Sequence, residues 1–328
     1  MNEGAFALLD CLGFKGIWNR GVTPEAVVAF MKESKAHAES TVKRWMAGFV
    51  EESSPQLCIA FVSDSIAIGA STSQKPPLAD WQKGYLILLV IAMCIELMQR
   101  FSGPQAPIPL VFRGSITFGP HLVHDAFFLG PAVDEAASLA QVGQGAFVWL
   151  TPDAHRNYSA FTRDFSSLVL QKLQQLPSDE IIRRADSLLL TASTLSSNPP
   201  DQTQNAMARW RAANQEKKLS AADLLFRWFL SSFRSDLVLP SYPMELKSGG
   251  TLQAAVVNLL AAVPDAAHLS SIARILSGFD GNNNLDVLLK GQSTERLLSK
   301  GAEAAKAANK QAQQVIAQYI PAIDTALA

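Results

Sequence analysis

Two β-rich apolar runs, residues 57–62 and 66–70, are separated by only Ser63, Asp64 and Ser65. A connection this short joins antiparallel strands, because parallel neighbours need a crossover of a dozen or more residues. We therefore predict a β-hairpin with an aspartate at its tip. Any fold of this chain must accommodate that antiparallel pair.

Further strands and helices are predicted from hydrophobic periodicity and from the residues that begin and end them. A buried strand at residues 5–9 stops at Asp10, and Thr23 is placed to cap a helix that begins at Pro24. Beyond the hairpin we expect helices at 79–101 and 132–140, strands at 110–118 and 145–150, and strands within 237–257. The order β-α-β-β-α-β-α-β predicts an α+β fold with a ferredoxin-like sheet and flanking helices.

The chain has 328 residues, which suffices for one elaborated domain or for two. We assign residues 1–260 to one domain with a central helical insertion at about 164–235, and residues 261–328 to a helical C-terminal region. Residues 196–203 are rich in Ser, Asn, Pro, Asp and Gln, which is typical of a solvated loop. An amphipathic helix rich in Ala, Lys and Gln is expected at about 293–319.

The composition is that of a folded protein, with 48% apolar residues, 17% charged residues and a formal net charge of -1. Nucleic-acid binding needs a dense basic surface that releases counterions, so we expect no nucleic-acid partner. The cysteines Cys11, Cys58 and Cys94 are odd in number and lie in apolar runs. This pattern predicts reduced, packed thiols rather than disulfides.

The apolar run at residues 85–98 is shorter than the roughly 20 residues that a bilayer requires, and Glu96 interrupts its end. We predict a buried helix there, either in the core or at a dimer interface, and no membrane partner. The N-terminus has neither the basic region nor the long apolar region of a signal peptide. We therefore expect a cytoplasmic protein.

Asp10 and Asp64 each end or interrupt an apolar strand. If these strands are neighbours in one sheet, both carboxylates emerge at the same edge, where they can hold two divalent cations about 3.5 to 4 Å apart. The alternative is that each aspartate only caps a turn. Gly13 and Gly16 follow Asp10 closely, and the backbone N–H groups of such a turn can cradle phosphate oxygens.

Six segments, in order, resemble the class III nucleotide cyclases, the catalytic fold of adenylate and guanylate cyclases. They are FALLDCLGFKG, LCIAFVSDSIAIGA, RGSITFG, LGPAVDEAASLAQ, GAFVWLTPDAHRNY and YPMELKSGGTLQAAVVN. The third is similar to the family's RVGIHTG strand, and the fourth is similar to its WGDTVNLASRME segment. The resemblance covers roughly residues 5–163 and 236–258.

This resemblance implies a nucleoside triphosphate as substrate and two divalent cations, Mg²⁺ or Mn²⁺, as cofactors. Asp10, the backbone carbonyl of Cys11 and Asp64 match the positions that hold the cations. The backbone amides around Phe14 and Lys15 match those that hold the β- and γ-phosphates.

The resemblance also implies a homodimer with active sites between the subunits. Lys247 matches the lysine that reaches the triphosphate from the partner subunit, and a solvated hairpin lysine is the alternative. Arg113 begins the strand expected beside Asp10 and is our candidate for a catalytic cation, with packing or an ion pair as the alternative. His121 and His124, with Asp125, are expected in an exposed loop after that strand, and contact with the base of the nucleotide is the alternative.

Four positions depart from the family pattern. Asp134 stands in place of the ribose-positioning asparagine, and Ser138 in place of the arginine that stabilises transition-state charge. Ala60 and Phe127 stand where adenylate cyclases carry the lysine and the aspartate that read adenine. An ordinary adenylate or guanylate cyclase is therefore not expected.

The degenerate pattern is most similar to the pyrimidine cyclases of bacterial Pycsar anti-phage systems, whose products act on a separate effector. This resemblance implies UTP as the first choice of substrate, CTP as the second, and a role in antiviral defence. A catalytically silent nucleotide-binding sensor is one alternative. An interaction scaffold built on the helical C-terminal region is another. The retained Asp10, Asp64 and Lys247 favour the enzyme.

Overall fold

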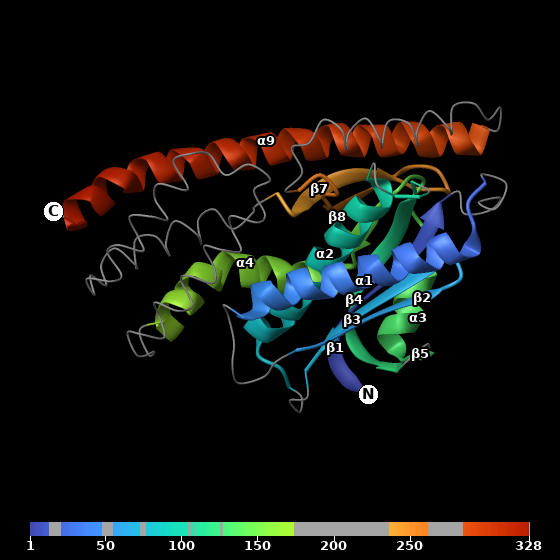
Figure 1. The fold of residues 1–328 in the computed structure, drawn as a ribbon, viewed down its shortest axis with the longest axis horizontal. Helices are drawn as coiled ribbons and strands as arrows, with labels where there is room; N and C mark the ends of the chain where they lie inside the picture. Colours follow the sequence, from blue (N-terminus) through green and yellow to red (C-terminus); the bar gives the residue numbers. More distant parts are fainter. Residues whose placement is uncertain are drawn as a thin grey trace.

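A mixed β-sheet runs through the computed structural model, which describes residues 1–12, 21–47, 55–72, 77–103, 106–107, 109–124, 127–173, 236–261 and 285–327 (Figure 1). The described strands are β1 (Asn2–Leu12), β2 (Gln56–Val62), β3 (Ser65–Ser71), β4 (Val111–His124), β5 (Phe127–Leu129), β6 (Val148–Leu150), β7 (Val238–Glu245) and β8 (Thr251–Val257). They lie side by side in the order β2-β3-β1-β4-β6-β8-β7, and β5 pairs with β4. All neighbours are antiparallel except β4 and β6.

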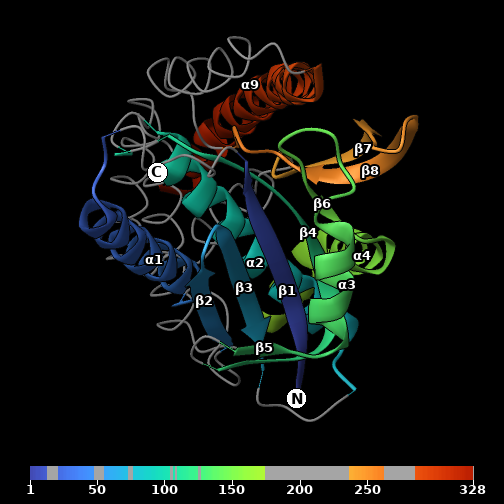
Figure 2. The same ribbon diagram turned by 90° about the vertical axis from the view of Figure 1, so that its right-hand side faces the viewer.

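Helices cover both faces of this sheet. The described helices are α1 (Pro24–Ala47), α2 (Asp80–Ser102), α3 (Pro131–Leu139), α4 (Pro152–Leu173) and α9 (Leu285–Leu327). Residues of α1, α2 and α4 pack on one face, whereas α3 packs on the other (Figure 2). The α+β class is therefore as the sequence predicts, and so is the order of the described elements apart from the short strand β5.

Alternation along β1 separates the two faces, because successive side chains of a strand point to opposite sides. Ala5, Ala7 and Leu9 belong to the large core that contains α2. Phe6 belongs to the smaller cluster with α3, and Leu8 packs against that cluster. Asp10 continues the even-numbered set and so lies on the α3 face.

Helix α2 is apolar around almost its whole circumference because it is buried between the sheet, α1 and α4. It is long and apolar enough to cross a membrane by length and composition, but 83% of its apolar window is buried inside the molecule. Gly84 permits the close approach of α4, since a Cβ there would lie 2.1 Å from Cβ of Phe161. The prediction of a buried helix over residues 85–98 is confirmed, with the core rather than a dimer interface as its setting.

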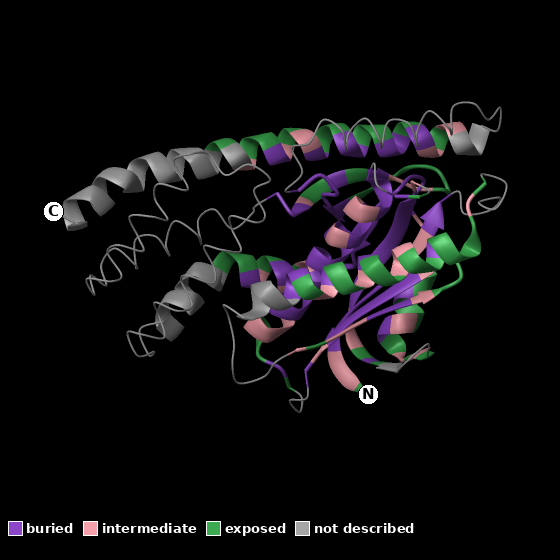
Figure 3. Cartoon of the chain, in the orientation of Figure 1, coloured by how far each residue is buried: buried purple, intermediate pink, exposed green. Residues whose placement is uncertain are grey.

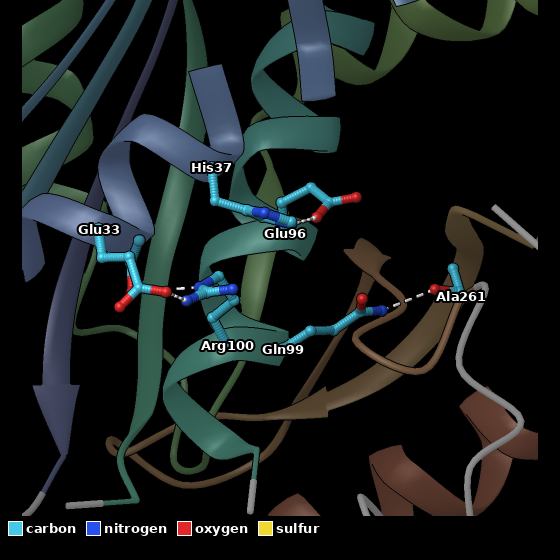
Figure 4. Close-up of polar contacts among 7 residues, drawn as sticks. Glu33, His37, Glu96, Gln99, Arg100 and Ala261 are labelled. Carbon is cyan, nitrogen blue, oxygen red and sulfur yellow. Dashed lines mark hydrogen bonds and ion pairs between the residues drawn. The ribbon is translucent and has the colours of Figure 1, made fainter. Parts of the chain in front are cut away.

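Polar contacts join α2 to its neighbours along one side (Figure 4). Arg100 Nη2 donates to Glu33 of α1 at 2.6 Å, and His37 of α1 lies 3.3 Å from the carboxylate of Glu96. Gln99 Nε2 donates to the carbonyl of Ala261, just beyond β8, at 2.7 Å. Helix α2 is therefore bonded both to α1 and to the segment that follows β8.

Helix α9 crosses the β7–β8 hairpin at that far edge (Figure 1). In Figure 3 its first half shows buried residues on the side toward the sheet. Leu297 packs in a small cluster with hairpin residues such as Tyr242 and Met244, while Leu298 belongs to the large core. Adjacent residues of α9 thus join two separate apolar clusters.

The predicted end of one strand needs revision, and one short strand was not predicted. Strand β4 does not end near residue 118 but continues to His124, because it pairs with β1 as far as His121 and then with β5. Strand β5 was not predicted, since three residues are too few for a periodic signal. Helix α4 continues past residue 164, where the insertion was expected to begin, and residues 174–235 lie outside the described part of the chain.

Candidate active site

Asp10 and Asp64 lie at the same end of adjacent strands. The ladder between β1 and β3 ends with Asp10 opposite Ser65, and the amide of Cys11 donates to the carbonyl of Asp64 at 2.9 Å. Ser63 makes the hairpin turn between β2 and β3 in the left-handed region, at φ 56°. The sequence prediction that the two aspartates share one edge is therefore correct in its geometry.

Arg113 completes this group from the other side of β1. It lies opposite Asp10 in the β1–β4 ladder, and its Nε and Nη2 donate to Asp10 Oδ2 at 2.9 and 2.7 Å. The side chains are only 10% and 18% exposed, so the pair is shielded from water. Buried charges need such compensation, and the ion pair foreseen as the alternative role of Arg113 is present.

The guanidinium of Arg113 has hydrogen-bonding capacity to spare. Its Nη1 is buried and has no hydrogen-bond partner within the described part of the chain. A buried donor without a partner costs free energy, and a ligand oxygen beside Asp10 would relieve that cost. The arrangement can therefore bind an anionic oxygen next to a carboxylate.

The donors around Asp10 and Asp64 fit a divalent cation of the Mg²⁺ or Mn²⁺ type. Two carboxylates and the carbonyl of Cys11 offer oxygen ligands, which such hard cations prefer. No group of three or more His, Cys, Asp or Glu side chains suited to a metal occurs among the described residues. A cation here would complete its shell with water and substrate oxygens, as Mg²⁺ commonly does.

Helix α3 is fixed against β4 by two buried hydroxyl groups. Ser115 Oγ donates to the carbonyl of Ala136 at 3.0 Å, and Thr117 Oγ1 donates to the carbonyl of Ala132 at 3.0 Å. Both hydroxyls lie on the same side of β4 as Arg113, because they follow it at even spacing. The α3 face of the sheet therefore carries both the anchored helix and the Asp10–Arg113 pair.

Asp134 and Ser138 lie one turn apart on the exposed side of α3. The hydroxyl of Ser138 donates to the carbonyl of Glu135 at 2.8 Å, so it is partly engaged with its own helix. Neither side chain carries a positive charge. The described structure therefore offers no cation at the position where the resembled family has its arginine.

Ala60 and Phe127 present no hydrogen-bonding side chain to a base. Ala60 lies opposite Ala67 in the β2–β3 hairpin and is buried. Phe127 begins β5 and is 68% exposed. The two positions thus differ from each other in exposure but share an apolar character.

Lys247 is exposed in the turn between β7 and β8, and its amide donates to the carbonyl of Val142 at 3.1 Å. Strands β4, β6 and β8 lie between β1 and β7. In strand order, the hairpin that carries Lys247 is therefore at the opposite side of the sheet from β2 and β3, with β4 and β6 between it and β1.

Some predicted site residues lie outside the described part of the chain, namely Phe14, Lys15 and Asp125. The prediction that His121 sits in an exposed loop is wrong. It is buried in β4, its ring packs at a tilt of 51° against Phe6 with ring centroids 5.6 Å apart, and it shares a hydrogen bond of 3.1 Å with the carbonyl of Gly119. Burial lowers its pKa, an effect that the Gly119 carbonyl partly opposes.

One polar cluster had no signal in the sequence. Ser293 and Arg296 of α9 both donate to the carboxylate of Glu245 at the end of β7. The residues are about 50 positions apart, and no motif links them. Only the docking of α9 on the hairpin brings them together.

No protein-family model matches the chain, and no curated protein matches it. Among solved structures, the adenylyl cyclase CyaB from P. aeruginosa is similar over 48% of this chain and 81% of its own, with 14% identity and a TM-score of 0.35. The catalytic core of a rhodopsin-guanylyl cyclase with converted specificity, in complex with ATPalphaS, is similar over 48% of this chain and 80% of its own, with 11% identity and a TM-score of 0.35. These structural neighbours are both nucleotide cyclases.

Proposed function

We propose that this chain is a nucleotide cyclase that converts a nucleoside triphosphate to its 3′,5′-cyclic monophosphate. The 3′ oxygen attacks the α-phosphorus and loses its proton, a new oxygen–phosphorus bond closes the ring, and the bond to the β-phosphate breaks to release pyrophosphate. The observation that carries this proposal is the adjacency of Asp10, Asp64 and Arg113 at one end of β1, β3 and β4. Carboxylates and a guanidinium together suit a substrate that brings both cations and phosphates.

Each residue of this group has a separate task. Asp10, Asp64 and the carbonyl of Cys11 would hold the divalent cations. When bound, these cations activate the attacking oxygen and neutralise charge on the polyphosphate. Arg113 holds Asp10 in place through two hydrogen bonds and has Nη1 available for a phosphate oxygen. The amides around Phe14 and Lys15 are proposed to hold the β- and γ-phosphates.

A complete site requires two copies of the chain. Lys247, the proposed triphosphate ligand, is carried by the hairpin at the far edge of the sheet, with β4 and β6 between it and the β1 strand of Asp10 in the same subunit. A two-fold homodimer would bring Lys247 of each subunit to the carboxylates of the other.

The substrate we favour is UTP, with CTP as the second choice. Ala60 and Phe127 offer no polar group with which to read a purine edge, and a site that lacks such groups does not select purines. By resemblance to the pyrimidine cyclases of anti-phage systems, the product would be a cytoplasmic second messenger that acts on a separate effector in antiviral defence.

A second candidate function is a catalytically silent nucleotide-binding module. It is favoured by Ser138, which stands without charge where the resembled family has a catalytic arginine, and by the engagement of Arg113 with Asp10. In that case nucleotide binding would persist without turnover. The presence of both carboxylates at one edge favours the enzyme.

The test is an assay of the purified full chain with Mn²⁺ or Mg²⁺ and each of the four nucleoside triphosphates. We expect release of pyrophosphate and a cyclic monophosphate from UTP or CTP, and loss of both with Asp64→Asn. Asp80→Asn is the matched control, because Asp80 is exposed and forms an ion pair with Lys83 within the first turn of α2. Saturable nucleotide binding without turnover would support the silent module, and turnover of ATP or GTP would contradict the pyrimidine assignment.

A further inference from the structure

The carboxylate of Glu245 is held at both oxygens by α9. Ser293 Oγ donates to Glu245 Oε2, and Arg296 Nη2 donates to Glu245 Oε1 at 2.5 Å. Arg296 Nη2 also lies 3.4 Å from Ser293 Oγ, so the three side chains form one connected cluster. We call this cluster the Glu245 clasp. Charge-assisted bonds of this kind fix geometry better than a single neutral bond does.

The clasp lies two residues from Lys247 along the chain. Only Leu246 separates the two residues, and Lys247 lies in the tight turn that the amide of Leu246 closes by donating to the carbonyl of Gly250 at 3.1 Å. Gly249 and Gly250 of this turn have φ values of 88° and 84°, which glycine adopts without strain. The position of Glu245 therefore bears directly on where the turn with Lys247 begins.

A second connection runs through the loop before β6. Thr294 Oγ1 of α9 accepts a hydrogen bond from the amide of Ala146 at 2.9 Å. In the same loop, the carbonyl of Val142 accepts a hydrogen bond from the amide of Lys247 at 3.1 Å, and the amide of Gln144 donates to the carbonyl of Glu245 at 2.8 Å. Helix α9 thus holds the hairpin directly and also through this loop.

The sheet alone gives the hairpin little support. Strand β8 pairs with β6 only at Trp149 opposite Val256 and Leu150 opposite Ala255, whereas β7 forms an outer edge. The tip around Lys247 extends beyond these pairs, because Glu245 pairs with Thr251. The position of the tip therefore depends on contacts outside the main ladders of the sheet, which the loop before β6 and α9 supply.

We propose that α9 acts as a positioning element for the reaction, in which Ser293 and Arg296 hold Glu245 and thereby set the position of Lys247 at the partner's triphosphate site. This inference rests on the proposed function of Lys247. It assigns a role to the C-terminal helix and identifies Ser293 and Arg296 as positioning residues that touch no substrate.

The first test measures amide hydrogen exchange over residues 245–251 in the full chain. We expect Ser293→Ala and Arg296→Gln each to raise the exchange of the Lys247 and Gly249 amides, without a change in β1. Lys300→Gln is the matched control, because Lys300 is on the same helix and pairs only with exposed Glu303 within the described residues. Unchanged exchange in both clasp variants would overturn the proposal, whether or not the protein turns over nucleotide.

The second test measures KM and kcat for the nucleotide that the parent protein uses. We expect Arg296→Gln to raise KM about two- to fivefold, which corresponds to the loss of one partly exposed ion pair. In Lys247→Ala, the further change Arg296→Gln should have no added effect, because the lysine through which it acts is gone. Fully additive effects would overturn the proposal. A parent protein without turnover would contradict the cyclase assignment instead, and the exchange measurement would then decide the role of α9 by itself.

Discussion

The two hairpins of the sheet, β2–β3 and β7–β8, both end in proposed site residues but are held in different ways. Strand β3 pairs with β1 at seven successive positions that end beside Asp10. Strand β8 pairs with β6 at two positions. Asp64 is therefore placed by a continuous backbone ladder, whereas Lys247 sits on a hairpin that the sheet holds weakly.

The apolar packing of the two hairpins differs in the same sense. Ile59, Ile66 and Ile68 of β2–β3 belong to the large core with α1 and α2. The base of the β7–β8 hairpin, at Val238, Ala255 and Val257, also belongs to this core. Its outer part, with Tyr242 and Met244, packs in a separate small cluster to which α9 contributes Leu297. The Asp64 hairpin therefore belongs to the central fold along its length, while the outer part of the Lys247 hairpin also packs on a helix that follows later in the chain.

The largest expected effect separates the roles of the two aspartates. Asp10→Asn leaves the shielded guanidinium of Arg113 without its counter-charge, which should cost about 3 kcal/mol of unfolding free energy. Asp64→Asn removes no ion pair seen among the described residues and should leave stability nearly unchanged. Both variants should reduce turnover at least about a hundredfold, since each removes a ligand for charge neutralisation. Urea unfolding and pyrophosphate release measure the two effects.

A double variant checks the physical reason for this difference. Replacing both partners, Asp10→Asn with Arg113→Met, should recover part of the lost stability, because no buried charge remains unpaired. Turnover should stay low. Equal stability losses in Asp10→Asn and Asp64→Asn would show that the ion pair does not distinguish the two positions.

A smaller effect is expected when a methyl group is added at a close contact in each half of the proposed site, in β4 beside β1 and in α9 near the end of β8. In Gly114→Ala, the new Cβ would lie 2.2 Å from the backbone oxygen of Leu8, and neither strand can yield, so a cost of up to about 3 kcal/mol is expected. In Gly301→Ala of α9, the new Cβ would lie 2.2 Å from Oδ1 of Asn258, which is the end of a side chain. Rotation of Asn258 would relieve this contact but would break its hydrogen bonds to the carbonyl of Gly301 and the amide of Leu260. The gain in helix propensity offsets part of that loss, so a net cost of about 1 to 2 kcal/mol is expected. Thermal unfolding of both variants tests the contrast, and a larger loss at Gly301 would reverse the ranking of the two halves.

The sequence predicts the first half of the molecule well, because the signals there are local. The three-residue link at Asp64 fixes a hairpin, and Thr23 caps α1 as expected, with its Oγ1 accepting the amide of Ala26 at 3.2 Å. The apolar run that begins at Tyr85 indicates a buried helix, and α2 is buried there. Strand β5 and the extension of β4 to His124 were missed, because pairing between strands, rather than local periodicity, determines them.

The candidate site shows the same difference between a part that the sequence predicts and a part that it does not. Asp10, Asp64 and Arg113 are close together because β3, β1 and β4 are neighbours in the sheet. The predicted ferredoxin-like order of strands and helices implies this arrangement. That order does not imply the Glu245 clasp, since Ser293 and Glu245 are joined only by the docking of α9. Hydroxyl, guanidinium and carboxylate groups are common on exposed helices, so nothing in the sequence marks these three as partners.

The smallest expected effect is on the pH dependence of the free energy of unfolding, which should differ between the part of the sheet around β1 and the β7–β8 hairpin. His121 is buried beside Phe6 in the half that contains β1, and no histidine occurs in β7 or β8. Burial lowers the pKa of His121 in the folded protein. The unfolded chain therefore takes up a proton first as the pH falls through about 6.5. The free energy of unfolding should decrease from there down to the lower pKa of the folded state, and it should be constant above that window as far as His121 is concerned.

The variant His121→Phe retains a ring against Phe6 and removes the titrating group. Urea unfolding between pH 7.5 and 5.5 should show a smaller loss of stability on acidification in this variant than in the parent. Some dependence should remain, because burial also lowers the pKa of His155 in α4. An unchanged pH dependence in His121→Phe would mean that the β1 half gains no acid sensitivity from its buried histidine, and the difference between the two halves would then lie in packing alone.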